Sequence, residues 1–230
     1  MQNKNKENGN ENYLVINFKT YLEGSGKKAE QLAKIADKIA KRTGKKIILV
    51  VQETDVNRIS NLVSIPVFSE HLDPIEYGAH TGQVLAESLK FNGAKGVVLN
   101  HSEDRFNLAQ IEKSKKIAKK NKLQTIICAN DSDQAAALSQ FKPDFLAVEP
   151  PELIGGNTSV SKAKPEIIID TVMKVRKAHK KQAILCGAGI KTEKDVKKAI
   201  ELGTNGIFVA SGIVKSKTPE KKIKELVKYL

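Results

Sequence analysis

Short apolar runs alternate with longer amphipathic segments along most of this chain. The runs are rich in β-branched residues and nearly continuous, which is typical of strands buried on both faces of a parallel sheet. They cover residues 13–19, 47–51, 66–69, 96–100, 125–129, 145–148, 183–186 and 206–210. The pattern therefore predicts eight parallel strands.

The segments between these runs have the period of amphipathic helices. Residues 32–40 place five apolar side chains on one helical face, and residues 223–230 repeat the spacing. Glycines follow three predicted helices and prolines suit the first turn of two others, at Gly44, Gly93, Gly203, Pro165 and Pro219. Each predicted strand is thus followed by a predicted helix.

Eight strands alternating with eight helices predict an α/β protein of the (β/α)₈ barrel class, with parallel strands inside an outer ring of helices. The alternative is a doubly wound open sheet. A dinucleotide-binding sheet would carry a GxGxxG turn after its first strand, and residues 18–24 contain none. We expect residues 1–12 to form a disordered polar tail and residues 13–230 to form one barrel domain.

Composition narrows the class of protein further. The chain has 230 residues, and 39 Lys and Arg against 26 Asp and Glu give a formal charge of +13, which raises nucleic acid as a partner. The lysine clusters in residues 113–122, 174–181 and 215–228 lie on predicted helices, so we expect a solvated outer shell and no nucleic acid partner. No run reaches membrane-spanning length, and two cysteines indicate a reducing compartment, which predicts a cytoplasmic protein.

Polar residues at the ends of the predicted strands are the candidates for chemistry, because barrels of this class build their active sites there. Asn17 and Lys19 end the first strand, two residues apart and so on one face of it. His101 follows the fourth strand, and Glu149 follows the sixth. A strand-end lysine is often just solvated and a lone histidine is often structural. A carboxylate directly after an apolar run, however, is costly unless it is paired or functional.

Three glycine-containing loops complete the predicted site. Residues 150–156 pair a stiff Pro-Pro start with two glycines, a composition that suits a closing lid as well as an ordinary turn. The last two strands end in small-residue turns around Gly189 and Gly212, where such barrels frequently bind phosphate. No cluster of His, Asp and Glu has convincing metal-ligand spacing, so we predict no metal. Cys128 and Cys186 are interpreted as small buried residues.

Three motifs together resemble the triosephosphate isomerase family, its short archaeal type in particular. They are Asn17-Phe18-Lys19, Asn100-His101-Ser102-Glu103 and Glu149-Pro-Pro-Glu-Leu-Ile154-Gly155, each after the expected strand. The likeness extends from Tyr13 to Leu230. It implies a cofactor-free isomerase of glycolysis and gluconeogenesis that interconverts dihydroxyacetone phosphate and D-glyceraldehyde 3-phosphate through a cis-enediolate.

The resemblance also implies residue roles. Glu149 would be the base, His101 the neutral electrophile and Lys19 the fixed positive charge, with Asn17 binding substrate oxygens. Ser102 and Glu103 would support them. The remaining substrate or phosphate contacts would come from Phe18, Ile154, Gly155, Gly189, Ala210, Ser211 and Gly212. The family is dimeric or tetrameric, so we expect a homo-oligomer, with a tetramer favoured over a dimer.

One departure from the family pattern concerns the lid. The family's lid continues Ile-Gly-Thr-Gly, whereas this chain reads Ile154-Gly155-Gly156-Asn157, which predicts slower or looser closure rather than lost activity. The alternatives are another sugar-phosphate isomerase on the same barrel, or a barrel that binds a phosphometabolite without catalysis. Substrate profiling with triose and pentose phosphates distinguishes them.

Overall fold

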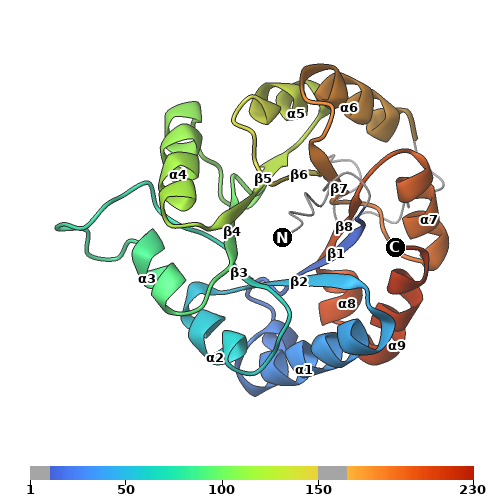
Figure 1. Cartoon of the computed structure of the whole chain (residues 1–230). Coiled ribbons are helices and arrows are strands. Elements are labelled where there is room, and N and C mark those ends of the chain that lie inside the picture. The colour runs from blue at the N-terminus through green and yellow to red at the C-terminus, as the bar shows by residue number, and fades with distance from the viewer. Residues whose placement is uncertain (1–10, 150–164) are drawn as a thin grey trace, which may run out of the picture.

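The computed structural model describes residues 11–149 and 165–230, and the parallel strands of these two ranges close into a barrel in sequence order, from β1 round to β8 paired with β1 (Figure 1). The strands are β1 (Tyr13–Asn17), β2 (Lys46–Val51), β3 (Val67–Ser69), β4 (Gly96–Leu99), β5 (Gln124–Ala129), β6 (Phe145–Val148), β7 (Ala183–Cys186) and β8 (Gly206–Val209). The predicted barrel is confirmed, and closure leaves no open edge, which excludes the doubly wound sheet.

The helices surround the barrel in the order in which they occur along the chain (Figure 1). They are α1 (Gly26–Thr43), α2 (Val56–Ser60), α3 (Ala86–Phe91), α4 (Leu108–Lys120), α5 (Ser132–Ser139), α6 (Pro165–Ala178), α7 (Glu193–Glu201), α8 (Ser211–Val214) and α9 (Pro219–Leu226). Short 3₁₀ turns add η1 (Leu22–Gly24), η2 (Glu53–Asp55) and η4 (Val227–Tyr229). In the described ranges, no helix is long and apolar enough to cross a membrane.

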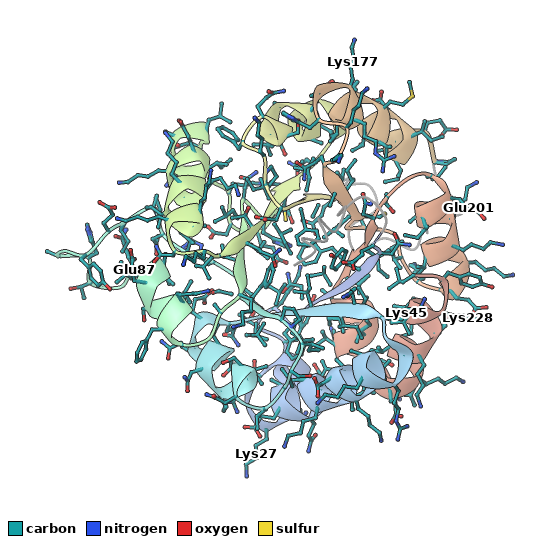
Figure 2. All side chains as sticks on the ribbon, in the orientation of Figure 1. Lys27, Lys45, Glu87, Lys177, Glu201 and Lys228 are labelled. Atoms are coloured by element: carbon teal, nitrogen blue, oxygen red, sulfur yellow. The ribbon has the colours of Figure 1, made fainter. Side chains whose placement is uncertain are left out.

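Two apolar layers hold the barrel together. Side chains that point inward from the strands, such as Val15, Val50 and Phe208, form one buried cluster inside the barrel. Their outward neighbours, such as Leu14 and Ile16, form a larger cluster under the helices. The split follows from the twofold alternation of side chains along a strand. Charged side chains such as Lys27, Lys177 and Glu201 lie on the outer ring of helices (Figure 2).

The glycine and prolines that the sequence analysis placed at helix ends lie at the ends of helices in the structure. Gly44 caps α1 in the left-handed conformation at φ 69°, and its N–H donates to the Ala40 carbonyl at 2.9 Å. α6 begins at Pro165 and α9 begins at Pro219. Local sequence therefore sets where these helices begin and end.

Four strands are shorter than predicted: β3 by one residue at its start, and β1, β4 and β8 at the mouth of the barrel. β1 ends at Asn17 and β4 ends at Leu99, because Lys19 (φ 47°) and Asn100 (φ 58°) take left-handed backbone conformations that cannot continue a strand. Glu11 lies within the predicted tail, and its carboxylate accepts a hydrogen bond from the Tyr13 hydroxyl at 2.8 Å.

Candidate active site

A cavity of about 450 Å³ opens at the carboxyl ends of the strands. Predicted site residues among its walls are Asn17, Lys19, His101, Ser102, Glu103, Glu149, Gly189, Ala210, Ser211 and Gly212. These residues come from five well-separated parts of the chain, and closure of the barrel brings them together.

Among the described residues, Phe18 is the one predicted site residue that does not line this cavity. The Phe18 ring is fully buried in the outer apolar layer, because the side chain that follows the inward-pointing Asn17 points outward. The prediction that Phe18 lines the substrate site is therefore wrong for its side chain. Ile154 and Gly155 lie outside the described residues, as does the whole predicted lid.

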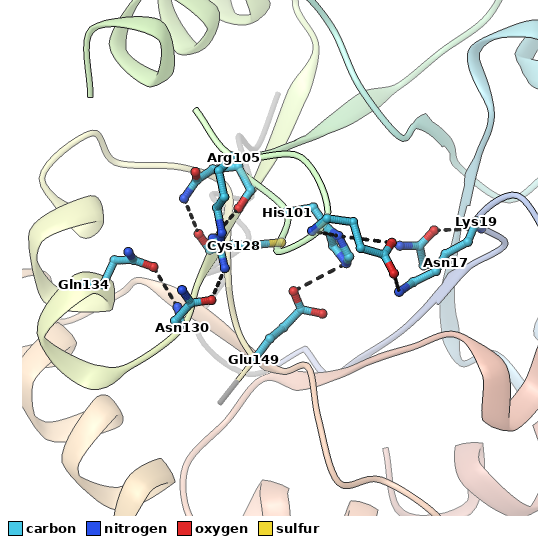
Figure 3. A network of polar contacts seen from close by, with 10 residues as sticks. Asn17, Lys19, His101, Arg105, Cys128, Asn130, Gln134 and Glu149 are labelled. Carbon is cyan, nitrogen blue, oxygen red and sulfur yellow. Dashed lines mark hydrogen bonds and ion pairs between the residues drawn. The ribbon is translucent and has the colours of Figure 1, made fainter. Parts of the chain in front are cut away.

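Lys19 is held at the mouth of the barrel by a backbone hydrogen bond and by an ion pair. Its N–H donates to the Asn17 side-chain oxygen at 3.1 Å, and its Nζ donates to Glu103 Oε1 at 2.7 Å. The strand ends before Lys19, so strand alternation does not orient this side chain; the left-handed turn does. The ammonium group is thereby fixed beside His101 (Figure 3).

Hydrogen bonds made by Asn100 set the start of the loop that carries His101. The Asn100 amide nitrogen donates to the Cys128 carbonyl at 2.9 Å, and its side-chain oxygen accepts from the Phe106 N–H at 3.0 Å. Arg105 donates to the Asn100 carbonyl at 2.8 Å and also contacts the Asn130 side chain. These bonds stabilise the left-handed Asn100 and tie the loop to the end of β5.

The hydrogen bonds of His101 select one tautomer of the neutral ring. Nδ1 accepts the Glu103 backbone N–H at 3.2 Å, so the ring proton is assigned to Nε2. Nε2 points at Glu149 Oε2, 3.5 Å away (Figure 3). Both atoms are buried, and within the described ranges neither has a hydrogen-bond partner. A proton donor and a carboxylate therefore face one another, and no hydrogen bond within the described ranges occupies either atom.

Glu149 lies directly after β6, and its neighbours leave no space behind its side chain. Its N–H donates to the Ala129 carbonyl at 2.8 Å. A Cβ atom at Gly187 would lie 2.5 Å from Glu149 Cγ, so this position requires glycine. Burial and the charge of Glu149 raise the pKa of the Cys128 thiol well above its usual value, which keeps the thiol protonated beside the carboxylate.

The opposite wall of the cavity consists of the turns after β7 and β8. Gly189 has a left-handed backbone at φ 73°, and Ser211 and Gly212 begin α8. The first N–H groups of a helix have no acceptor inside it, so those of Ser211 and Gly212 are available to an anion. Lys191 also lines this wall and adds positive charge.

Some residues at the site were not singled out from the sequence. Gly187 and Tyr21 line the cavity, and Arg105 supports its floor. Glu70, which directly follows β3, is mostly buried. Burial and the nearby Glu53 carboxylate raise its pKa to about 8. A carboxylate directly after an apolar run was the signal used for Glu149, and the same signal applies to Glu70.

The arrangement can move a proton between neighbouring carbon atoms of an anionic substrate. It offers one buried carboxylate that can act as a base, one imidazole Nε2–H that can donate a hydrogen bond and one fixed ammonium group. In the ranges that the structure describes, no group of three or more His, Cys, Asp and Glu side chains is placed to hold a metal ion.

Comparisons with known proteins point to one family. The family model described as triosephosphate isomerase matches residues 12–229. The triosephosphate isomerase of Methanothermus fervidus is 47% identical over 214 residues, 93% of this chain and 96% of that protein. That of Methanocaldococcus jannaschii is 45% identical, covering 94% and 99%. The crystal structure of triosephosphate isomerase from Bartonella henselae superposes with a TM-score of 0.72 at 18% identity, covering 93% and 98%, which shows the shared fold.

Proposed function

The chain belongs to the triosephosphate isomerase family, and we propose that its barrel cavity interconverts dihydroxyacetone phosphate and D-glyceraldehyde 3-phosphate through a cis-enediolate. The observation that carries the proposal is the buried pair of His101 Nε2 and Glu149 Oε2, 3.5 Å apart. Aldose–ketose interconversion requires a base at carbon and a hydrogen-bond donor at oxygen, and this pair supplies both.

Glu149 acts as the base in this mechanism. Its carboxylate removes a proton from C1 or C2 and returns it to the other carbon, while a second proton passes between the substrate oxygens O1 and O2. The tight contact with Gly187 fixes the position of the side chain, which supports a reacting geometry that does not depend on substrate to order it. No redox step occurs, so the reaction needs no cofactor.

His101 and Lys19 stabilise the negative charge that develops on the substrate oxygens. The Nε2–H of neutral His101 donates to the enediolate oxygen, and the Lys19 ammonium group provides a fixed positive charge beside it. Asn17 contributes its side-chain amide to the same oxygens. Glu103 holds Lys19 in place, and Ser102 completes this wall of the cavity.

The phosphate group binds at the opposite wall. Backbone groups of Gly189, Ala210, Ser211 and Gly212 line that side of the cavity, and Lys191 adds charge. Helix N-termini and small-residue turns favour doubly charged phosphate because their N–H groups converge on it. We assign Ile154 and Gly155, in the loop beyond Glu149, to the same task on the strength of the family resemblance.

We further propose that the protein is a homo-oligomer, with a tetramer favoured over a dimer. The segment between β3 and α3 extends away from the barrel (Figure 1) and contains Tyr77, which is 78% exposed. A hydrogen bond from the Val84 N–H to the Asp73 carboxylate, at 2.7 Å, closes the base of this segment. An exposed aromatic side chain on a projecting segment is typical of a subunit contact, and light scattering measures the mass that decides it.

For the cellular setting we propose the cytoplasm and the triose phosphate step of glycolysis and gluconeogenesis. The pathway follows from the substrate, and the compartment is supported by two buried free thiols, which a reducing environment preserves.

A coupled assay with D-glyceraldehyde 3-phosphate tests the proposed function. We expect turnover without added metal or cofactor, and competitive inhibition by 2-phosphoglycolate, which mimics the charge of the enediolate. Turnover of pentose phosphates in place of trioses would contradict the assignment.

A further inference from the structure

Two neighbouring hollows lie at the amino-terminal ends of β5, β6 and β7, opposite the active-site cavity. Their volumes are about 520 and 410 Å³, and they share Lys142 and Asp144 in their walls. Seven lysines line them: Lys115, Lys116, Lys119, Lys122, Lys142, Lys180 and Lys181. We call this combined surface the basic groove.

The positive charge of the basic groove is mostly unneutralised. Lys115 pairs with Asp144 at 3.4 Å, and Lys116 pairs with Glu112 at 2.6 Å. The other five lysines form no ion pair with any residue of the described ranges, and all five are exposed. The sequence predicted that the lysines form a solvated outer shell on the helices. The fold instead brings lysines from the turns before three strands together with those of α4, which concentrates charge in one place.

Two of these lysines occupy backbone positions that favour glycine. Lys122 (φ 54°) and Lys142 (φ 50°) lie in the turns from α4 to β5 and from α5 to β6. The corresponding left-handed position is glycine in three other helix-to-strand turns, at Gly44, Gly93 and Gly203. A side chain in this conformation is strained, so its use at two positions of one groove points to a role for the lysines themselves.

The groove offers positive charge without a side chain that reads one particular anion. It contains no arginine, whose planar fork makes paired bonds to carboxylates and phosphates, and its lysine ammonium groups act as point charges. Phe141 is half-buried against the outer apolar layer and His179 is half-buried as well, so neither ring offers an exposed stacking platform for bases. A row of exposed ammonium groups without base-reading side chains fits a phosphodiester backbone.

We propose that the basic groove binds nucleic acid through its phosphate backbone, without sequence preference. The groove and the active-site cavity share no residue, so nucleic acid and triose phosphate can occupy the protein together.

Fluorescence anisotropy with a labelled 20-nucleotide oligo(U) and the full chain tests this proposal over a range of salt concentrations. The test variant is Lys122→Gly with Lys142→Gly. The control is Lys27→Gln with Lys34→Gln, two exposed lysines of α1 that remove the same charge. We expect the groove variant to bind about 10-fold more weakly than the parent chain. The slope of log K against log salt concentration should fall in magnitude by about 1.4, because each of the two lost phosphate contacts contributes about 0.7. The control should change less than about 2-fold.

Thermal unfolding and isomerase assays accompany the binding measurement. Because glycine relieves the left-handed strain, the groove variant should melt no lower than the parent chain and keep its turnover. Equal weakening in the control variant would overturn the proposal, because binding would then reflect net charge alone. Tighter binding of poly-glutamate or of anionic vesicles than of oligo(U) would also overturn it.

Discussion

His101 Nε2 and Glu149 Oε2 face one another at 3.5 Å, although they follow strands that are not neighbours in the barrel. Both atoms are buried and have no hydrogen-bond partner in the described part of the chain. A fold optimised for stability alone would satisfy such atoms, because a buried polar atom without a partner costs about 1–3 kcal/mol. Their pairing across the cavity is the relationship on which the proposed mechanism rests.

Glu149→Gln tests the base. The amide keeps the size of the side chain and removes its basicity, so we expect kcat to fall by about 10²- to 10⁴-fold. The free energy of unfolding should not decrease, because a neutral group replaces a buried carboxylate. The coupled assay and thermal unfolding measure both quantities. Glu201→Gln, at an exposed position of α7, is the matched control, and near-normal turnover of Glu149→Gln would exclude this residue as the base.

Gly187→Ala tests the positioning of Glu149. The added methyl group would lie 2.5 Å from Glu149 Cγ and must displace that side chain. We expect kcat to fall by about 10- to 100-fold, since a shift of about 1 Å in a reacting group has an effect of that size. Gly44→Ala is the contrast: nothing lies within 4 Å of its Cβ, but its φ of 69° is left-handed. It should lose about 1 kcal/mol of stability and keep full turnover.

Lys19→Met tests the fixed positive charge. Methionine retains much of the length and removes the ammonium group, so we expect kcat/KM to fall by about 10²-fold or more. Lys27→Met, at an exposed position of α1, removes a distant charge and should alter kcat/KM less than about 2-fold at moderate ionic strength. Steady-state kinetics at two salt concentrations separates the local effect from long-range attraction. Similar losses in the two variants would contradict a specific role for Lys19.

Glu70→Gln tests the buried carboxyl group after β3. Burial and Glu53 raise its pKa to about 8, from an ordinary value of 4.5. Between these two pH values the unfolded chain binds fewer protons at this group than the folded chain, so the free energy of unfolding falls as pH rises from about 4.5 to about 8. The glutamine variant lacks this titration. We expect it to be more stable at pH 8 by about 1–3 kcal/mol.

Chemical denaturation at pH 5 and pH 8 measures this difference. The gain from Glu70→Gln should be largest at pH 8 and shrink toward pH 5, whereas Glu201→Gln, whose carboxylate is exposed, should show no comparable trend. A gain that is the same at both pH values would mean that the glutamine packs better, and that ionisation of Glu70 has no part in it.

Much of the site follows from the sequence because strand ends are readable in a parallel barrel. Apolar runs locate the strands, and the rule that barrel sites lie at carboxyl ends singles out Lys19, His101 and Glu149. Once the closed barrel is inferred, the three residues are expected at the same mouth, because the carboxyl ends of all its strands meet there. Gly187 escaped notice because its importance lies in the distance to Glu149, a residue 38 positions earlier in the chain.

The sequence by itself determined the barrel, its helix caps and the residue types at its mouth, since these depend on periodicity and on local conformational preferences. Tertiary structure decided how those residues are aimed: the left-handed turn at Lys19, the outward Phe18 ring and the proton placement on His101. It also decided that lysines far apart in the chain share one groove. Contacts of this kind depend on distances across the closed barrel, and a linear pattern carries no such distances.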